Sequence, residues 1–225
     1  GVGSRGGARA ARLSLHTHAV REAPTFSLSL FILTTSMYRL LALALVLAAP
    51  VAAQDAFILE DVLTRSGGMR GGNGPFTLLD LRDGSVVVAH DDASRADSAS
   101  TAWDLGLRGN EVILNGGASG PGGLAGALMD AGFDEVTAVP TDGRTADGDE
   151  DCPRGAARIV CHGSGNGWYT YTDSGVLPIP GKTLVVVRPD GTGAKVRFVE
   201  YRLGASMSGP RLVTLEVAPL ASAGE

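Results

Sequence analysis

The sequence predicts a mainly β domain in which antiparallel hairpins pack as a sandwich, with one or two short helices. Several stretches place an apolar run on either side of a glycine-containing turn, which is the pattern of a β-hairpin. The 32 glycines in 225 residues predict many turns. An apolar period of 3.6 residues, typical of an amphipathic helix, is sparse. Successive hairpins with little helix indicate an antiparallel β architecture.

The first two hairpins are expected at 76–90 and 103–115. The first has the dipeptide Asp-Gly, at 83–84, between two apolar runs, which is the strongest short-range signal for a hairpin. The second repeats the arrangement around the tripeptide Arg-Gly-Asn at 108–110. Both turns contain the glycine that favours a tight connection between strands.

A longer hairpin is expected at 182–203, with its turn at 189–193, and a half-buried strand is expected at 211–217. Within the hairpin, the apolar residues keep one alternation up to Phe198 and the opposite alternation from Val199 onward. Side chains of a strand alternate between its two faces. The change of phase therefore predicts a β-bulge or a crossing between two packed surfaces.

Helix signal is confined to two stretches. Residues 124–133 place Leu124 and Leu128 four positions apart, which predicts about three helical turns with one apolar face. Met129 lies on the same face and is expected in the core. Residues 55–65 are expected to form either a second short helix or the strand that enters the domain.

Residues 37–53 have the features of a secretory signal peptide. Arg39 gives a positive start, an apolar run follows at 40–49, and small residues permit cleavage after Ala53. The rival interpretation, a transmembrane helix that also takes in 26–36, would bury Arg39 near its middle. The apolar run alone is also shorter than the about 20 residues that a membrane span needs. We therefore expect an exported protein.

The two parts on either side of the signal peptide differ in composition. Residues 1–36, rich in Arg, Gly, Ser and Ala, are expected to be upstream translation outside the native protein. Residues 54–225 are expected to form a single domain, with 14 of the 19 basic and 23 of the 24 acidic residues and a net charge of −9. Such a surface repels nucleic acid and anionic lipid. We expect neither partner, and an extracellular or periplasmic protein without stable membrane insertion after cleavage.

The two cysteines, Cys152 and Cys161, are expected to form a disulfide. Export to an oxidising compartment favours the bond, which would close a loop of ten residues. A metal or redox pair is the alternative interpretation. The sequence has neither the C-x-x-C spacing nor a second pair of ligands that this alternative needs.

Three other patterns give little support for a catalytic or cofactor site, and we expect no enzymatic activity. The glycines in 112–126 have a dinucleotide-like spacing, but the sequence offers one strand–helix unit at most, so a plain loop is expected. The acidic stretch 142–152 lacks the acid spacing of a calcium loop and is expected to be solvated. A hydrolase would need His162 near a buried acid and a hydroxyl, and the sequence has no G-x-S-x-G elbow.

Three motifs occur in order along the chain. They are WD-x-x-x-R with a strand ending in NGG, at 103–117, WY-x-Y at 168–171, and an R-x-DG turn followed by K-x-R-F-x-x-Y, at 188–201. In this order and spacing the chain resembles the HmuY-like family from about Phe76 onward. The resemblance implies a mainly antiparallel β protein, exported by Gram-negative bacteria, that captures haem for iron acquisition and delivers it to an outer-membrane receptor.

The resemblance also implies two histidines that hold the haem iron. One belongs just after WY-x-Y, where this chain has Asp173, Ser174 and Gly175, and the other near the acidic loop, where no histidine occurs. A haem site needs an axial donor, an apolar slot and partners for the propionates. The candidate iron ligands are His162 first and His90 second. The alternative is a non-haem extracellular binding or interaction module on the same scaffold.

Overall fold

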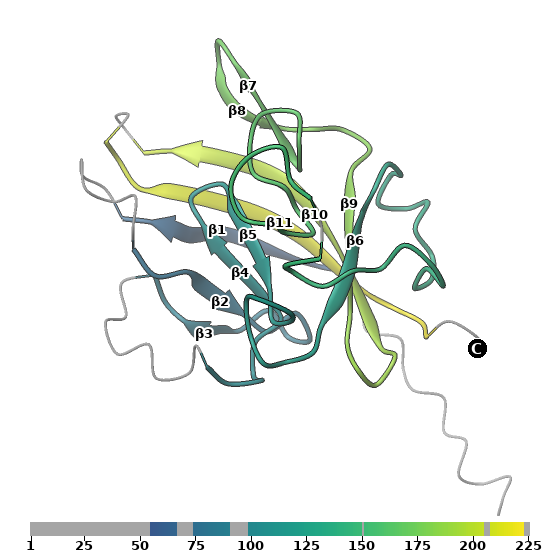
Figure 1. The fold of residues 1–225 in the computed structure, drawn as a ribbon. Helices are drawn as coiled ribbons and strands as arrows, with labels where there is room; N and C mark the ends of the chain where they lie inside the picture. The colour runs from purple at the N-terminus through teal and green to yellow at the C-terminus, as the bar shows by residue number, and fades with distance from the viewer. Residues whose placement is uncertain (1–54, 67–73, 91–98, 150, 205–207, 223–225) are drawn as a thin grey trace, which may run out of the picture. The chain divides into compact units, whose positions relative to one another are not determined.

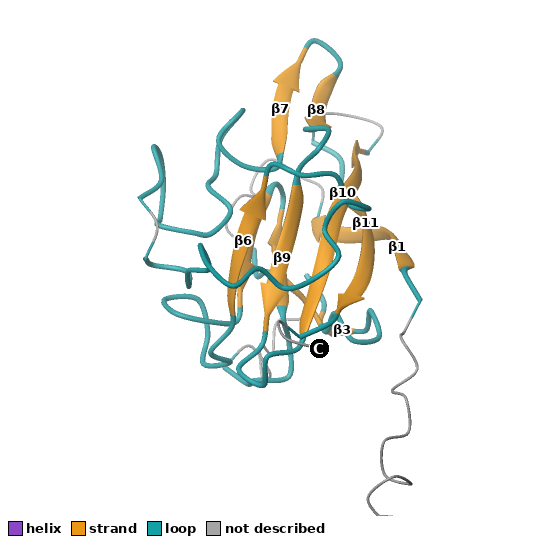
Figure 2. Ribbon diagram, turned by 90° about the vertical axis from the view of Figure 1, so that its right-hand side faces the viewer, coloured by secondary structure: helices purple, strands orange, loops and turns teal. Residues whose placement is uncertain are grey.

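The computed structural model describes five stretches of the chain: 55–66, 74–90, 99–149, 151–204 and 208–222. They form two antiparallel sheets and a separate two-stranded ribbon (Figure 1). The described residues contain strands and loops but no helix (Figure 2). The predicted antiparallel β fold class is therefore confirmed. The expected upstream segment, the signal peptide and its cleavage site lie outside the described residues.

The larger sheet has five strands in the order β1-β11-β10-β9-β6, each antiparallel to its neighbours. Its strands are β1 (Phe57–Arg65), β6 (Ala125–Met129), β9 (Thr183–Val187), β10 (Gly193–Leu203) and β11 (Arg211–Leu220). The predicted hairpin at 182–203 is β9–β10, and the predicted strand at 211–217 lies within β11. Of the two expectations for 55–65, the entry strand is the one confirmed.

The smaller sheet has four strands in the order β3-β2-β4-β5. Its strands are β2 (Thr77–Leu79), β3 (Val86–Val88), β4 (Leu105–Arg108) and β5 (Glu111–Leu114). The two predicted hairpins are confirmed as β2–β3 and β4–β5. In the second, Arg108 pairs with Glu111, so Gly109 and Asn110 form a two-residue turn. Gly109 has φ of 58°, a conformation that glycine adopts without strain.

The main apolar core lies between the two sheets, as expected for a sandwich. β9 is buried on both faces, because alternate residues belong to the main core and to a second cluster on the other side of the larger sheet. The core takes fully buried side chains from both sheets: Leu79, Leu105 and Leu107 from the smaller, and Leu184, Val196 and Leu215 from the larger.

A buried ion pair links the two sheets. Asp104 precedes β4 and Arg188 follows β9, and their side chains are 3% and 6% exposed. The Nε and Nη2 atoms of Arg188 donate to the two carboxylate oxygens of Asp104 at 3.1 and 2.6 Å. The backbone N–H of Leu81 donates to the same carboxylate at 2.9 Å. The buried carboxylate therefore has the charge-assisted partners that it needs.

β10 contains the predicted irregularity. Phe198 pairs with Leu215 and Glu200 pairs with Thr214, so Val199 is an extra residue on this strand. The β-bulge predicted from the change of apolar phase is thus confirmed. Beyond the bulge, Tyr201 is half-buried.

The ribbon consists of β7 (Tyr169–Thr172) and β8 (Gly175–Pro178), and it projects beyond the two sheets (Figure 1). Trp168 anchors its base, because the indole is 2% exposed and stacks on Phe198 with 4.1 Å between ring centroids. The indole N–H donates to the carbonyl of Asn110 at 3.1 Å. The other tryptophan, Trp103, is also buried.

The prediction of a helix at 124–133 is wrong, because residues 125–129 form strand β6, antiparallel to β9. Leu124 and Leu128 both pack in the main core, as a helix would also have placed them. A spacing of four residues is a multiple of the strand period of two, so it does not separate the two structures. Gly126 favours the strand, because a Cβ there would lie 2.4 Å from the carbonyl oxygen of Val185.

The glycine-rich segment that follows β5 is a loop, as predicted, and a buried asparagine organises it. The side-chain amide of Asn115 donates to the carbonyls of Ser100 and Trp103 at 3.0 and 2.8 Å. Its Oδ1 accepts from the N–H of Gly122 at 2.9 Å. A Cβ at Gly122 would lie 2.7 Å from the side chain and the backbone of Asn115. This glycine therefore permits the close approach that the loop requires.

The acidic stretch 142–152 differs from the prediction of a solvated loop at Asp147, which is 1% exposed. Its carboxylate accepts from the N–H groups of Leu114 and Ile159, both at 3.0 Å, and from the hydroxyl of Ser119 at 2.6 Å. Three hydrogen bonds satisfy the buried charge. In the part of the chain that the structure describes, no three His, Cys, Asp or Glu residues are grouped to hold a metal ion.

Cys152 and Cys161 form the predicted disulfide. We expect the double substitution Cys152→Ser and Cys161→Ser to lower the free energy of unfolding by about 2–3 kcal/mol, because the unfolded chain loses the constraint of a ten-residue loop. Urea denaturation measures the difference. A reducing agent should bring the unsubstituted protein to the level of the double variant and leave that variant unchanged. Equal stability of the two oxidised proteins would contradict the expectation.

Candidate functional site

A cavity of about 700 Å³ lies beside the β7–β8 ribbon. Its wall combines the end of β1, the β4–β5 turn, the residue after the disulfide, the ribbon itself and the ends of β10 and β11. We call it the ribbon cavity. A volume of this size is suitable for a small-molecule ligand. The charged and aromatic side chains that matter below are Arg65, Arg108, Arg211, His162, Tyr171 and Tyr201.

Two arginines stand directly opposite each other in the wall of the ribbon cavity. Arg65 on β1 pairs in register with Arg211 on β11. Like charges at directly opposed positions of a sheet repel and destabilise it. A third arginine, Arg108, lies in the same wall and forms an ion pair with Glu111 at 2.6 Å. The opposed pair therefore provides positive charge that an anionic ligand would stabilise.

The aromatic part of the ribbon cavity is formed by Tyr171 and Tyr201. Tyr171 is 59% exposed, and its hydroxyl accepts from the side-chain amide of Asn110 at 3.1 Å. Its ring packs edge-on against Tyr169, with 5.4 Å between centroids. Burial and the nearby Tyr171 raise the pKa of Tyr169 to about 12, and burial raises the pKa of Tyr201. These phenols thus stay protonated at neutral pH.

His162, the first candidate ligand, lines the ribbon cavity. Its ring is half-buried and lies 6.2 Å from the ring of Tyr169. Its Nε2 is 3.2 Å from Oδ1 of Asn110. An amide oxygen only accepts hydrogen bonds, so Nε2 donates, and Nδ1 of the neutral ring keeps a lone pair. The turn residue Asn110 thereby fixes which nitrogen of His162 is free to bind a ligand.

His90, the second candidate, lies in a different part of the fold. It is buried and lines a cavity of about 380 Å³ whose walls include residues of β1 and β3. Its ring packs on Gly74, where a Cβ would lie 2.7 Å from the ring. The structure does not bring His90 and His162 into one cavity. Their roles as iron ligands stay predictions.

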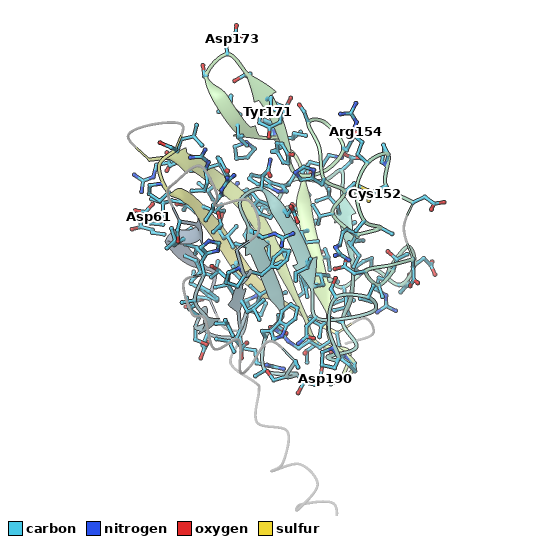
Figure 3. All side chains as sticks on the ribbon, turned by 60° about the vertical axis from the view of Figure 1, so that its left-hand side comes forward. Asp61, Cys152, Arg154, Tyr171, Asp173 and Asp190 are labelled. Carbon is cyan, nitrogen blue, oxygen red and sulfur yellow. A yellow bond between two sulfur atoms is a disulfide. The ribbon has the colours of Figure 1, made fainter. Side chains whose placement is uncertain are left out.

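The ribbon turn is the place where the resemblance to the HmuY-like family implies one histidine. Asp173 lies at the tip of the ribbon, just after β7 ends, and Tyr171 lies lower, on β7 (Figure 3). The turn residues Asp173 and Ser174 and the first residue of β8, Gly175, all line the ribbon cavity, as His162 does. This chain thus presents an imidazole in the same cavity as that turn, but from a different position of the sequence.

Sequence reasoning did not single out the opposed arginines or Asn110. Arg65 and Arg211 lie near opposite ends of the domain in sequence, and only the register of β1 on β11 brings them together. Asn110 was expected as a turn residue, and its contacts with His162 and Tyr171 depend on how the ribbon packs. No local pattern in the sequence predicts the opposed arginines or the contacts of Asn110.

Several solved structures are similar to this chain. One from Bacteroides vulgatus, described as an HmuY-like haem-binding protein, has a TM-score of 0.44 and 18% identity, and the match covers 74% of this chain and 95% of the other. In fold, the chain is similar to HmuY-like proteins. An apo HmuY analog from Tannerella forsythia matches with a TM-score of 0.39 and 11% identity. This match covers 76% of this chain and 100% of the other. A protein from Bacteroides fragilis, described as a lipoprotein, matches with a TM-score of 0.41 and 15% identity. This match covers 74% of this chain and 94% of the other.

Two of these three structures are described in terms of HmuY, and the sequence motifs resemble the same family. No family model and no curated protein matches the chain. Among the described residues there is no helix long and apolar enough to cross a membrane.

Proposed function

We propose that this protein is an exported, HmuY-like haem-binding protein without catalytic activity, and that the ribbon cavity holds the haem. In this role the protein captures haem for iron acquisition and passes it to an outer-membrane receptor. The proposal rests on the ordered sequence motifs and on one structural observation. The opposed pair Arg65 and Arg211 lies in the same cavity as the imidazole of His162.

The residues of the ribbon cavity fit the chemical needs of haem. His162 would supply an axial nitrogen to the iron, and Arg65 and Arg211 would pair with the propionates. The faces of Tyr171 and Tyr201 would contact the flat macrocycle. Haem would supply the iron chemistry. The chain would bind and orient the haem and neutralise the charge of its propionates.

A second candidate function is a non-haem extracellular binding module on the same scaffold. The observation in its favour is the ribbon turn, where Asp173, Ser174 and Gly175 stand in place of a histidine. The cationic wall and the tyrosines would then serve another flat or extended anion. Metal-free protoporphyrin IX separates the two functions, because it offers the macrocycle and propionates without iron.

The test is a titration of the purified protein with hemin, followed at the Soret band. We expect saturable binding with a shifted Soret maximum, and at least about tenfold weaker binding by His162→Ala, since an axial ligand is lost. Arg65→Gln is expected to weaken binding without moving the Soret maximum, because it alters a propionate partner alone. His90→Ala, at the second candidate ligand, should bind hemin as the unsubstituted protein does, because His90 lines a different cavity.

Three results would contradict the proposal. They are the absence of a saturable Soret shift, identical spectra and affinities for His162→Ala and the unsubstituted protein, and equal affinities for hemin and metal-free protoporphyrin IX. The last result would support the non-haem function, since it would remove any contribution from iron ligation.

A further inference from the structure

A third cavity, of about 410 Å³, lies on the face of the smaller sheet that points away from the main core. We call it the outer cavity. Successive residues of β2 point to opposite faces of the smaller sheet, because Leu79 belongs to the main core and Leu78 to a separate outer cluster. The apolar floor of the outer cavity consists of Phe76, Leu78, Val88, Trp103 and Ile113.

Two arginines line the outer cavity, and no carboxylate is among its lining residues within the described chain. Arg108 lies over the ring of Phe76, with its Cζ 4.3 Å from the centroid. Its buried Nε donates no hydrogen bond within the described residues, although Nη2 is paired with Glu111. Arg158 donates at 3.4 Å to the carbonyl of its neighbour Ala157 and has no ion pair among the described residues.

This combination is unusual for the domain, which carries 23 acidic and 14 basic residues after the expected cleavage site. An exposed apolar floor is a feature of binding sites, and a guanidinium without an ion pair beside it favours an anionic group. Because Glu111 already neutralises Arg108, the cavity offers about one uncompensated charge, from Arg158.

We propose that the outer cavity binds an amphiphilic monocarboxylate, with the apolar part on the Trp103 floor and the carboxylate at Arg158 and Arg108. A monoanion suits the single uncompensated charge, and a guanidinium binds a carboxylate by paired hydrogen bonds. A short aliphatic or aromatic body suits a floor of this size. The site is separate from the ribbon cavity, although Arg108 lines both.

Octanoate and 1-octanol form the test, because they share the chain and differ in charge. Calorimetry of the purified protein is expected to show saturable octanoate binding and at least about tenfold weaker binding of octanol, the effect of a charge-assisted hydrogen bond. Octanoate should also change the emission of Trp103. Trp103→Phe, which keeps Trp168 as the remaining tryptophan, should lose this signal.

The variants locate the carboxylate. Arg158→Gln should weaken octanoate binding about tenfold and leave octanol unchanged, and Arg158→Lys should restore part of the loss. Arg154→Gln is the matched control, because Arg154 is an exposed arginine of the same disulfide loop, directed away from the strands (Figure 3). It should leave both ligands unaffected.

The proposal would be overturned by no octanoate binding, by equal binding of octanoate and octanol, by no effect of Arg158→Gln, or by an emission change that persists in Trp103→Phe. His162→Ala separates this site from the haem proposal. If it removed octanoate binding, the carboxylate would lie in the ribbon cavity and the proposal would be wrong. If octanoate binds unchanged to His162→Ala, the outer site stands whether or not hemin binds.

Discussion

Replacing Arg188 with alanine is expected to lower the free energy of unfolding by about 3–5 kcal/mol. The guanidinium occupies the interior between the two sheets and satisfies both carboxylate oxygens of Asp104. Without it, Asp104 keeps a buried negative charge whose remaining partner is the N–H of Leu81. Urea or guanidinium denaturation measures the loss.

The control for this prediction is the exposed ion pair between Arg202 and Asp61, whose side chains are 45% and 51% exposed. Arg202→Ala is expected to cost no more than about 1 kcal/mol, because water solvates both charges. A joint substitution, Asp104→Leu with Arg188→Met, should recover much of the stability, since it removes both buried charges. Equal losses for Arg188→Ala and Arg202→Ala would contradict the assigned role of the buried pair.

Trp168→Ala is expected to destabilise the protein by about 3–5 kcal/mol, the range for deleting a large buried aromatic side chain. The indole stacks on Phe198 and packs edge-on against Tyr169, so its loss leaves a hole at the base of the ribbon. The change also reaches the candidate site, because the indole N–H holds the carbonyl of Asn110, whose side chain contacts His162. Thermal or urea denaturation measures the effect on stability.

Two further variants separate packing from hydrogen bonding. Trp168→Phe keeps most of the aromatic contact and loses the N–H, so we expect a smaller loss, of about 1–3 kcal/mol. Tyr171→Ala, at an exposed position of the ribbon, should change stability by less than about 1 kcal/mol. If Trp168→Ala were as mild as Tyr171→Ala, the ribbon would not be anchored as described.

The hairpins could be predicted because their signal is local. A glycine turn between apolar runs fixes both strands and their connection, as at Gly109, and the bulge at Val199 is visible as a change of apolar phase. The helix expected around Leu124 and Leu128 shows the limit of such patterns. Their spacing suits a helix and a strand equally, and the pairing of Gly126 with Val186 of β9, which decides the outcome, is not local.

The candidate site was predictable only in part. His162 stood out because the domain has few other donors, but its partner Asn110 and the opposed Arg65 and Arg211 are brought near by tertiary packing and sheet register. Asp147 shows the same limit, since an acidic loop gives no sign that one carboxylate is buried on backbone N–H groups. The ribbon was missed because its strands carry few apolar residues to mark them.

The most direct test of the haem proposal is to locate the ligand by NMR. Ferric iron broadens amide signals near it, and gallium protoporphyrin IX supplies a matched control without unpaired electrons. With substoichiometric hemin, we predict early broadening at Asn110, His162 and Tyr171, with little change at Trp103 or His90, which line other cavities. Broadening centred on Trp103 or His90, or equal spectra with hemin and the gallium analogue, would contradict haem binding in the ribbon cavity.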